Sequence, residues 1–299
     1  MKLIAPDYYP DFHCIADKCR HSCCIGWEID IDPATRKKYR HVPGDFGARL
    51  NASIEDGKVS SFRLDADERC PMLNQSGLCD LITELGEENL CQICADHPRF
   101  RNHYLFQTEI GLGLCCEEAA RLILTQDKPM QLIELEDDGY DIRPDISETD
   151  LLNTREILIA CMQDNSRPLE QRLDILLDTV EFTIAERDWV HIFRCLERLD
   201  PAWDNCLDTL DLSRTAPPHL HQALGNFAAY MLYRHVAGDL EYDDIPGWVA
   251  FCVLSTQVVA ALCAAKPDCT IEDCIEFARM YSAEIEYSED NVAALLYAL

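Results

Sequence analysis

Four cysteines near the start of the chain form its densest group of residues that could do chemistry. Cys14, Cys19, Cys23 and Cys24 follow a C-x4-C-x3-C-C pattern within eleven residues. Adjacent residues of a helix or strand point in different directions, so Cys23 and Cys24 cannot both fill one core as small hydrophobes. The pattern therefore favours metal ligation by thiolates.

More cysteines follow this array. Ten of the 17 cysteines lie in the first 116 residues, the later six being Cys70, Cys79, Cys91, Cys94, Cys115 and Cys116. The sequence from Met1 to Asp7 has no apolar stretch long enough for a signal peptide. We therefore expect a reducing, cytoplasmic location, where clustered cysteines are more often metal-binding or catalytic than disulfide-bonded.

Spacing within this second group also indicates a metal. Cys91 and Cys94 form a C-x2-C pair with the bite of a zinc or iron–sulfur knuckle. Cys70 precedes a proline, an order that recurs in iron–sulfur proteins. All-thiolate sites suit both zinc and iron–sulfur clusters, so the residues leave both open.

Composition limits the classes of partner. The chain has 299 residues, 48% of them hydrophobic, which is enough for a sizeable core. Lys and Arg total 26 against 54 Asp and Glu, a net charge of −28 that argues against binding nucleic acid. The acidic surface serves either solubility or the attraction of a lysine-bearing partner.

The pattern of the chain predicts a mainly α fold. Its cysteine-rich metal-binding part, with short β-strands, spans residues 1–125; an acidic connector at 126–150 leads to an α-helical, bundle-like part at 151–299. In the first part we expect a strand at 27–32, followed by a helix at 33–39 that is capped by Asp32. A loop at 41–69 should hold a strand near 59–64, and Cys79 should lie on a short strand. A helical turn at 82–89 and a helix at 117–124 should follow.

The second part is predicted to be helical by its apolar periodicity. One stripe runs from Leu169 to Val180 and another from Leu220 to Met231. The 21 residues 245–265 carry no charge, so a membrane span is the competing interpretation. Their central Ser255, and flanks without a positive-inside bias, favour a buried helix, and we expect no membrane span.

Several short motifs together resemble a known family. After the first array come Gly26-Trp27, Cys70-Pro71-Met72-Leu73, Gly77-Leu78-Cys79, Leu90 to Cys94 with Pro98-Arg99, and Cys116-Glu117-Glu118-Ala119-Ala120-Arg121. In this order they resemble the flagellin lysine-N-methylase family, within the group of zinc- or iron-chelating cysteine-cluster proteins. The resemblance covers residues 8–125.

The resemblance implies a ligand set. Eight cysteines match the family pattern: Cys14, Cys19, Cys23, Cys24, Cys70, Cys79, Cys94 and Cys116. It implies a [4Fe-4S] cluster, with zinc as the alternative, and makes Trp27 and Arg99 candidate cofactor-binding residues. His97 stands where the family has tyrosine and is expected to be a neutral surface residue. Cys91 and Cys115 depart from the pattern, so serine should be tolerated there, whereas loss of Cys19 or Cys94 should abolish activity.

The implied function is N-methylation of lysines on flagellin with S-adenosylmethionine as methyl donor. No residue can be assigned as the catalytic base. The chain lacks the glycine-rich strand-to-helix turn of doubly wound methyltransferases and any C-x3-C-x2-C run. The alternatives are a non-enzymatic zinc or iron–sulfur module acting as scaffold or redox sensor, and an electron-transfer protein.

Overall fold

The computed structural model describes residues 1–139, 146–238, 240 and 244–299. Within these residues the fold is mainly α, as predicted. Two compact units are present: Met1–Phe12 with Phe100–Leu299, called here the helical unit, and His13–Arg99, called the cysteine unit.

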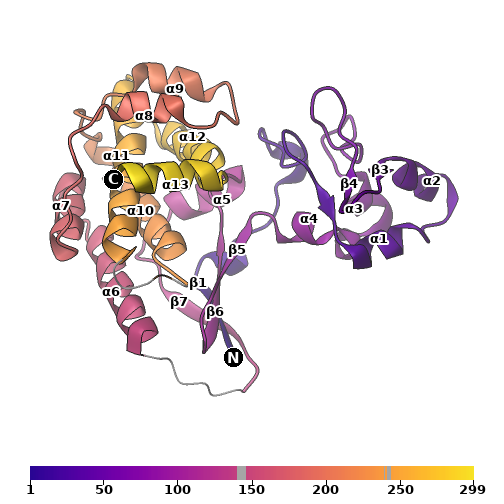
Figure 1. Ribbon diagram of the computed structural model, residues 1–299, viewed down its shortest axis with the longest axis horizontal. Helices are drawn as coiled ribbons and strands as arrows, with labels where there is room; N and C mark the ends of the chain where they lie inside the picture. Colours follow the sequence, from indigo (N-terminus) through magenta and orange to yellow (C-terminus); the bar gives the residue numbers. More distant parts are fainter. Residues whose placement is uncertain (140–145, 239, 241–243) are drawn as a thin grey trace. The chain divides into compact units, whose positions relative to one another are not determined.

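The helical unit is organised around two long helices, α10 (His221–His235) and α11 (Ile245–Ala265). Both are apolar on nearly every side, which suits helices covered by neighbours all round. The surrounding helices are α5 (Glu117–Leu124), α6 (Ile146–Met162), α7 (Leu169–Thr179), α8 (Trp189–Cys195), α9 (Trp203–Thr209), α12 (Ile271–Tyr281) and α13 (Glu289–Ala298) (Figure 1). A π-helical turn, Ser282–Glu286, follows α12.

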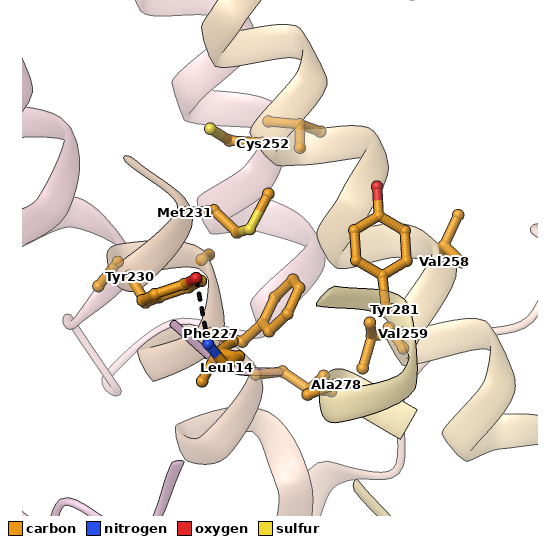
Figure 2. Close-up of a cluster of buried hydrophobic side chains, with 14 of the residues drawn as sticks. Leu114, Phe227, Tyr230, Met231, Cys252, Val258, Val259, Ala278 and Tyr281 are labelled. Carbon is orange, nitrogen blue, oxygen red and sulfur yellow. Dashed lines mark hydrogen bonds between the residues drawn. The ribbon is translucent and has the colours of Figure 1, made fainter. Parts of the chain in front are cut away.

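The predicted apolar stripes meet in one core. Leu169, Leu173 and Leu176 of α7 are buried, as are Leu224 and Phe227 of α10. Figure 2 shows Met231 of α10 near Cys252 of α11, and Phe227 of α10 near Tyr281 of α12, the two ring centres lying 6.1 Å apart. Cys252 and Cys263 of α11 are both almost fully buried in this core.

Helix α11 settles the question raised by residues 245–265. It is the one helix in the described part of the chain that is long and apolar enough to cross a membrane. However, 78% of its most apolar window is buried inside the protein. The prediction of a buried central helix is therefore confirmed.

A four-stranded sheet ties the first residues of the chain to the helical unit. Its order is β5 (Arg99–His103), β6 (Gln107–Leu112), β1 (Lys2–Pro6) and β7 (Leu132–Asp137). Strand β1 pairs parallel to β6 and antiparallel to β7. Gly111 is needed in β6, because a Cβ there would lie 2.3 Å from the ring of Phe100.

This sheet explains why the units do not follow the predicted division at 126–150. Residues 1–12 and 100–125 pack with the helices, because β1 pairs with strands that come about 100 and 130 residues later. The predicted connector supplies β7 and the start of α6, while its residues 140–145 lie outside the described part. Local patterning carries no information about such long-range pairing.

The cysteine unit is built from short elements. They are β2 (Asp30–Ile31), α1 (Pro33–Tyr39), α2 (Gly44–Ala52), β3 (Ile54–Glu55), β4 (Ser60–Phe62), α3 (Asp80–Leu85) and α4 (Gln92–Asp96), with sheet order β2-β4-β3. The helix predicted at 33–39 is confirmed, and Asp32 Oδ1 accepts its cap bond from the Thr35 amide at 2.9 Å. Helix α2, within the predicted loop, was missed.

Candidate cysteine centre

Five cysteines come together in the core of the cysteine unit. Cys70 and Cys91 are buried, and Cys24, Cys79 and Cys94 pack half-buried against the same apolar cluster. Cys70 interacts electrostatically with Cys24, Cys79 and Cys91, and Cys94 interacts with Cys24, Cys70 and Cys91. We call these five residues the thiol group.

Backbone pairing brings the distant members of the thiol group together. The Cys70 amide donates to the Cys24 carbonyl at 2.8 Å, and the Gly26 amide donates to the Glu68 carbonyl at 3.1 Å. Cys79 forms a bridge with Leu73 and stands as N-cap of α3. The predicted short strand at Cys79 is therefore a single bridge, because the chain turns at once into a helix.

Helix α4 supplies the last two thiols. Cys91 is its N-cap and Cys94 lies one turn later, so the two side chains share one face. Their thiols are hydrogen-bonded, and this bond lowers the pKa of Cys91 and raises that of Cys94. Cys91 has no exposed surface, so a residue expected to lie outside the pattern is in fact central.

Cys24 carries an acidic thiol. A hydrogen bond from the Cys23 thiol lowers its pKa to about 7, with help from Ser22 and Arg69, while burial opposes the shift. A thiolate is the form that binds metal or attacks electrophiles. Cys23 is exposed and lies outside the thiol group, which it contacts through this hydrogen bond.

The remaining predicted ligands lie elsewhere. Cys14 is exposed and its sulfur accepts from the Ala16 amide at 3.4 Å, and Cys19 donates to the His21 carbonyl at 3.3 Å. Neither belongs to the apolar core that holds the thiol group. Cys116 belongs to the helical unit, where it precedes α5.

The chemistry of the thiol group fits a thiophilic metal or an iron–sulfur cluster, since five sulfur donors lie in one small core. Within the described ranges, no three histidine, cysteine, aspartate or glutamate side chains are arranged to hold a metal ion. Binding one would therefore require these thiols to turn toward a common point.

Trp27 and Arg99, the two predicted cofactor-binding residues, both lie near His97: Trp27 is its neighbour in space, and Arg99 follows it by two positions in the chain. The Trp27 indole donates to the Cys23 carbonyl at 2.5 Å, and its ring centre lies 6.0 Å from that of His97. Burial lowers the pKa of His97 to about 4, so this histidine is neutral at pH 7, half-buried rather than on the surface. Arg99 donates to the Ala95 carbonyl at 3.2 Å.

The helical unit holds a buried polar network that sequence reasoning missed. The Glu286 carboxylate accepts from Tyr230 at 3.0 Å and lies 2.7 Å from His235 Nε2 and 3.4 Å from Arg234 Nε. Burial raises the pKa of Glu286, but Arg234 and His235 outweigh this and lower it to about 2. The π-helical turn aims Glu286 inward, and no residue pattern marks such a turn in advance.

Comparison with known proteins identifies relatives for part of the chain. A 140-residue match is 31% identical to "Lysine-N-methylase" from Salmonella choleraesuis and from Salmonella typhimurium, covering 43% of this chain and 34% of each relative. A 139-residue match is 28% identical to "Flagellar biosynthetic protein FliU" from Salmonella muenchen, covering 43% of this chain and 80% of that protein.

The chain thus spans about a third of the length of the first two curated relatives it matches. No protein-family model matches the chain, and no solved structure matches it either. These relatives confirm the family resemblance that the cysteine motifs indicated.

Proposed function

We propose, because the chain is a relative of the lysine-N-methylases, that it transfers methyl groups from S-adenosylmethionine to lysine side chains of flagellin. The observation that carries the proposal is the assembly of family-pattern cysteines, Cys24, Cys70, Cys79 and Cys94, in one core. Residues scattered over 71 positions of sequence are gathered by the fold, as a shared function for them requires.

The reaction is a nucleophilic displacement. The neutral lysine nitrogen forms a bond to the methyl carbon, the carbon–sulfur bond breaks, and its electron pair leaves with sulfur as a neutral thioether. The nitrogen then carries a positive charge and releases a proton to solvent. A lysine amine is protonated at pH 7, so the site must favour its neutral form by desolvation or nearby positive charge.

Charge distribution supports a lysine-bearing partner. The cysteine unit holds 11 of the 26 basic residues and only 15 of the 54 acidic ones, so most of the net negative charge belongs to the helical unit. An acidic surface raises the rate at which a basic partner is encountered, most strongly at low salt. We assign substrate attraction to the helical unit and the cofactor to the cysteine unit.

The thiol group is where we propose that an iron–sulfur cluster, or zinc, is held. Cys24, Cys70, Cys79, Cys91 and Cys94 would supply the ligands, and the bound group would supply a Lewis-acidic centre. The chain's own part is to keep the thiols in a water-poor core. The cytoplasm, as a reducing compartment, would preserve them unoxidised.

The test uses protein purified without oxygen, its cognate flagellin and S-adenosylmethionine. We expect the intact mass of flagellin to rise in steps of about 14 Da, one for each methyl group on lysine. Cys70→Ser should abolish the steps, while Cys195→Ser, an exposed cysteine of the helical unit, should retain them. If protein that contains iron and sulfide leaves the flagellin mass unchanged, the non-enzymatic metal module is the better description.

A further inference from the structure

The cysteine unit contains a cavity of about 570 Å³ that the proposed function has not used. It lies where α1, α4 and the β2–β4 pair meet. Its size falls in the range of about 300–1,000 Å³ that is usual for small-molecule sites. Ile31, Val59 and Ile93 give it an apolar wall, and charged side chains of both signs surround this wall.

The cavity shares a helix with the thiol group. Gln92 and Ile93, which line it, are the two residues between Cys91 and Cys94. The Asp32 carboxylate fixes this arrangement, because Oδ1 accepts from the Thr35 amide at 2.9 Å and Oδ2 accepts from the Gln92 amide at 3.0 Å. One side chain thus joins the start of α1 to the start of α4, beside the cavity.

Two of the basic side chains in the cavity are already engaged. Arg36 is almost buried and donates to both carboxylate oxygens of Asp56 and to Asn51, and Arg40 donates to Asp56 at 3.4 Å. These contacts hold the wall in place. They leave other charges to face a ligand.

The charged side chains of the cavity that remain available to a ligand are both positive and negative. Lys37 and Lys58 line the cavity and are exposed, and their ammonium groups have no hydrogen bond or ion pair to any part of the chain that the structure describes. The same holds for the side-chain carboxylate of Asp30. A ligand with one carboxylate, one ammonium group and a flat apolar portion matches two cations, one anion and an aliphatic wall.

We infer that this cavity binds an amino-acid nucleoside, the chemical class of S-adenosylmethionine, beside the cysteine-bearing helix α4. The inference rests on the proposed function, because that function supplies the cofactor. Lys37 and Lys58 would bind the ligand's carboxylate and Asp30 its ammonium group. Val59 and Ile93 would cover one face of the adenine base.

The experiment is calorimetric titration of the full-length protein with S-adenosylmethionine and with S-adenosylhomocysteine. Lys37→Glu reverses a charge in the cavity, while Lys38→Glu makes the same change at the next residue of α1, which is exposed and outside the cavity. We expect about a tenfold rise in Kd for Lys37→Glu, because the ligand's carboxylate would lose one favourable charge contact near the surface and gain one unfavourable contact. We expect no change in Kd for Lys38→Glu.

A second ligand identifies the contact itself. Decarboxylated S-adenosylmethionine lacks the carboxylate, so Lys37→Glu should not weaken its binding. Two outcomes would overturn this assignment: Lys37→Glu weakens the binding of both ligands equally, or neither Lys37→Glu nor Lys58→Glu changes the binding of S-adenosylmethionine. In either case the methylation assay still decides the function. A wild-type protein that methylates nothing but binds as predicted would refute the function and leave the cavity assignment standing.

Discussion

Among single residues, Cys91 shows best how burial changes an assignment. The family pattern leaves it out, yet it is fully buried, hydrogen-bonded to Cys94 and close to Cys70. Cys14 and Cys19, which fit the pattern, lie outside the apolar core of the same unit. A cysteine that matches the family pattern therefore need not belong to the thiol group, and a cysteine that departs from the pattern can belong to it.

This geometry revises the expectation that serine is tolerated at position 91. A serine hydroxyl there would have to be buried in a site shaped for sulfur, which costs about 1–3 kcal/mol if it is left without a partner. We expect Cys91→Ser to reduce the iron or zinc retained per chain as strongly as Cys94→Ser does, measured by elemental analysis after desalting. Cys195→Ser is the control, and full metal content in Cys91→Ser would contradict the prediction.

At the level of the element, the short helices of the cysteine unit depend on specific polar contacts. Helix α4 has only five residues, too few to be stable on its own. Its first amide is held by Asp32, which also caps α1. Burial opposes ionisation of Asp32, but the hydrogen bonds from Thr35 and Gln92 outweigh it and lower its pKa.

Removing this carboxylate should loosen both helices. We expect Asp32→Ala to cost about 1–2 kcal/mol, as for loss of an N-cap residue. Amide hydrogen exchange should speed up in peptides covering residues 33–39 and 91–97, and not in those from the helical unit. Asp30→Ala, two residues earlier and exposed, should leave exchange unchanged; equal effects of the two substitutions would refute the role given to Asp32.

The π-helical turn gives the helical unit a distinct response to acid. In the folded protein the pKa of Glu286 is lowered from its usual value of about 4.5 to about 2, so the unfolded chain binds more protons between these limits. The free energy of unfolding of the helical unit should therefore fall as the pH falls from about 4.5 to about 2.

The variant Glu286→Gln tests this origin. It should lower stability at pH 7 by about 3–5 kcal/mol, because Arg234 and His235 lose a buried anionic partner, and should flatten the dependence between pH 4.5 and 2. Chemical denaturation at several pH values is the measurement, with exposed Glu289→Gln as control. An unchanged slope in Glu286→Gln would show that other carboxylates cause the acid sensitivity.

At the scale of the whole molecule, the two compact units differ in the size of the apolar core that stabilises each of them. The cysteine unit has a small apolar core centred on Ile29, Ile31 and Leu50, whereas the helical unit buries α10 and α11. A small core provides little stability without a metal or another cross-link. Loss of the proposed metal should therefore destabilise the cysteine unit much more than the helical unit.

Limited proteolysis of a Cys23→Ser, Cys24→Ser double variant tests this. Cuts should concentrate in residues 13–99, and residues 1–12 and 100–125 should stay protected, because β1 and β6 pair within the helical unit. Mass spectrometry of the fragments locates the cuts. Early cleavage within residues 100–125 would instead favour the division at residue 125 that the sequence analysis predicted.

The sequence by itself determined what short-range chemistry and periodicity can specify. The cap at Asp32, the helix at 117–124 and the buried helix at 245–265 follow from neighbouring residues, and all three are confirmed. The cysteine motifs were enough to indicate the relatives. Each of these depends on residue types at fixed local spacing.

Only the tertiary structure decided which distant residues meet. It placed β1 between β6 and β7, selected Cys91 as a neighbour of Cys70, and aimed Glu286 at Arg234 and His235. These outcomes depend on strand pairing and on which side chains best fill a shared interior, and both involve residues far apart in the chain. Local spacing does not encode that information, which is why the units and the members of the thiol group differed from expectation.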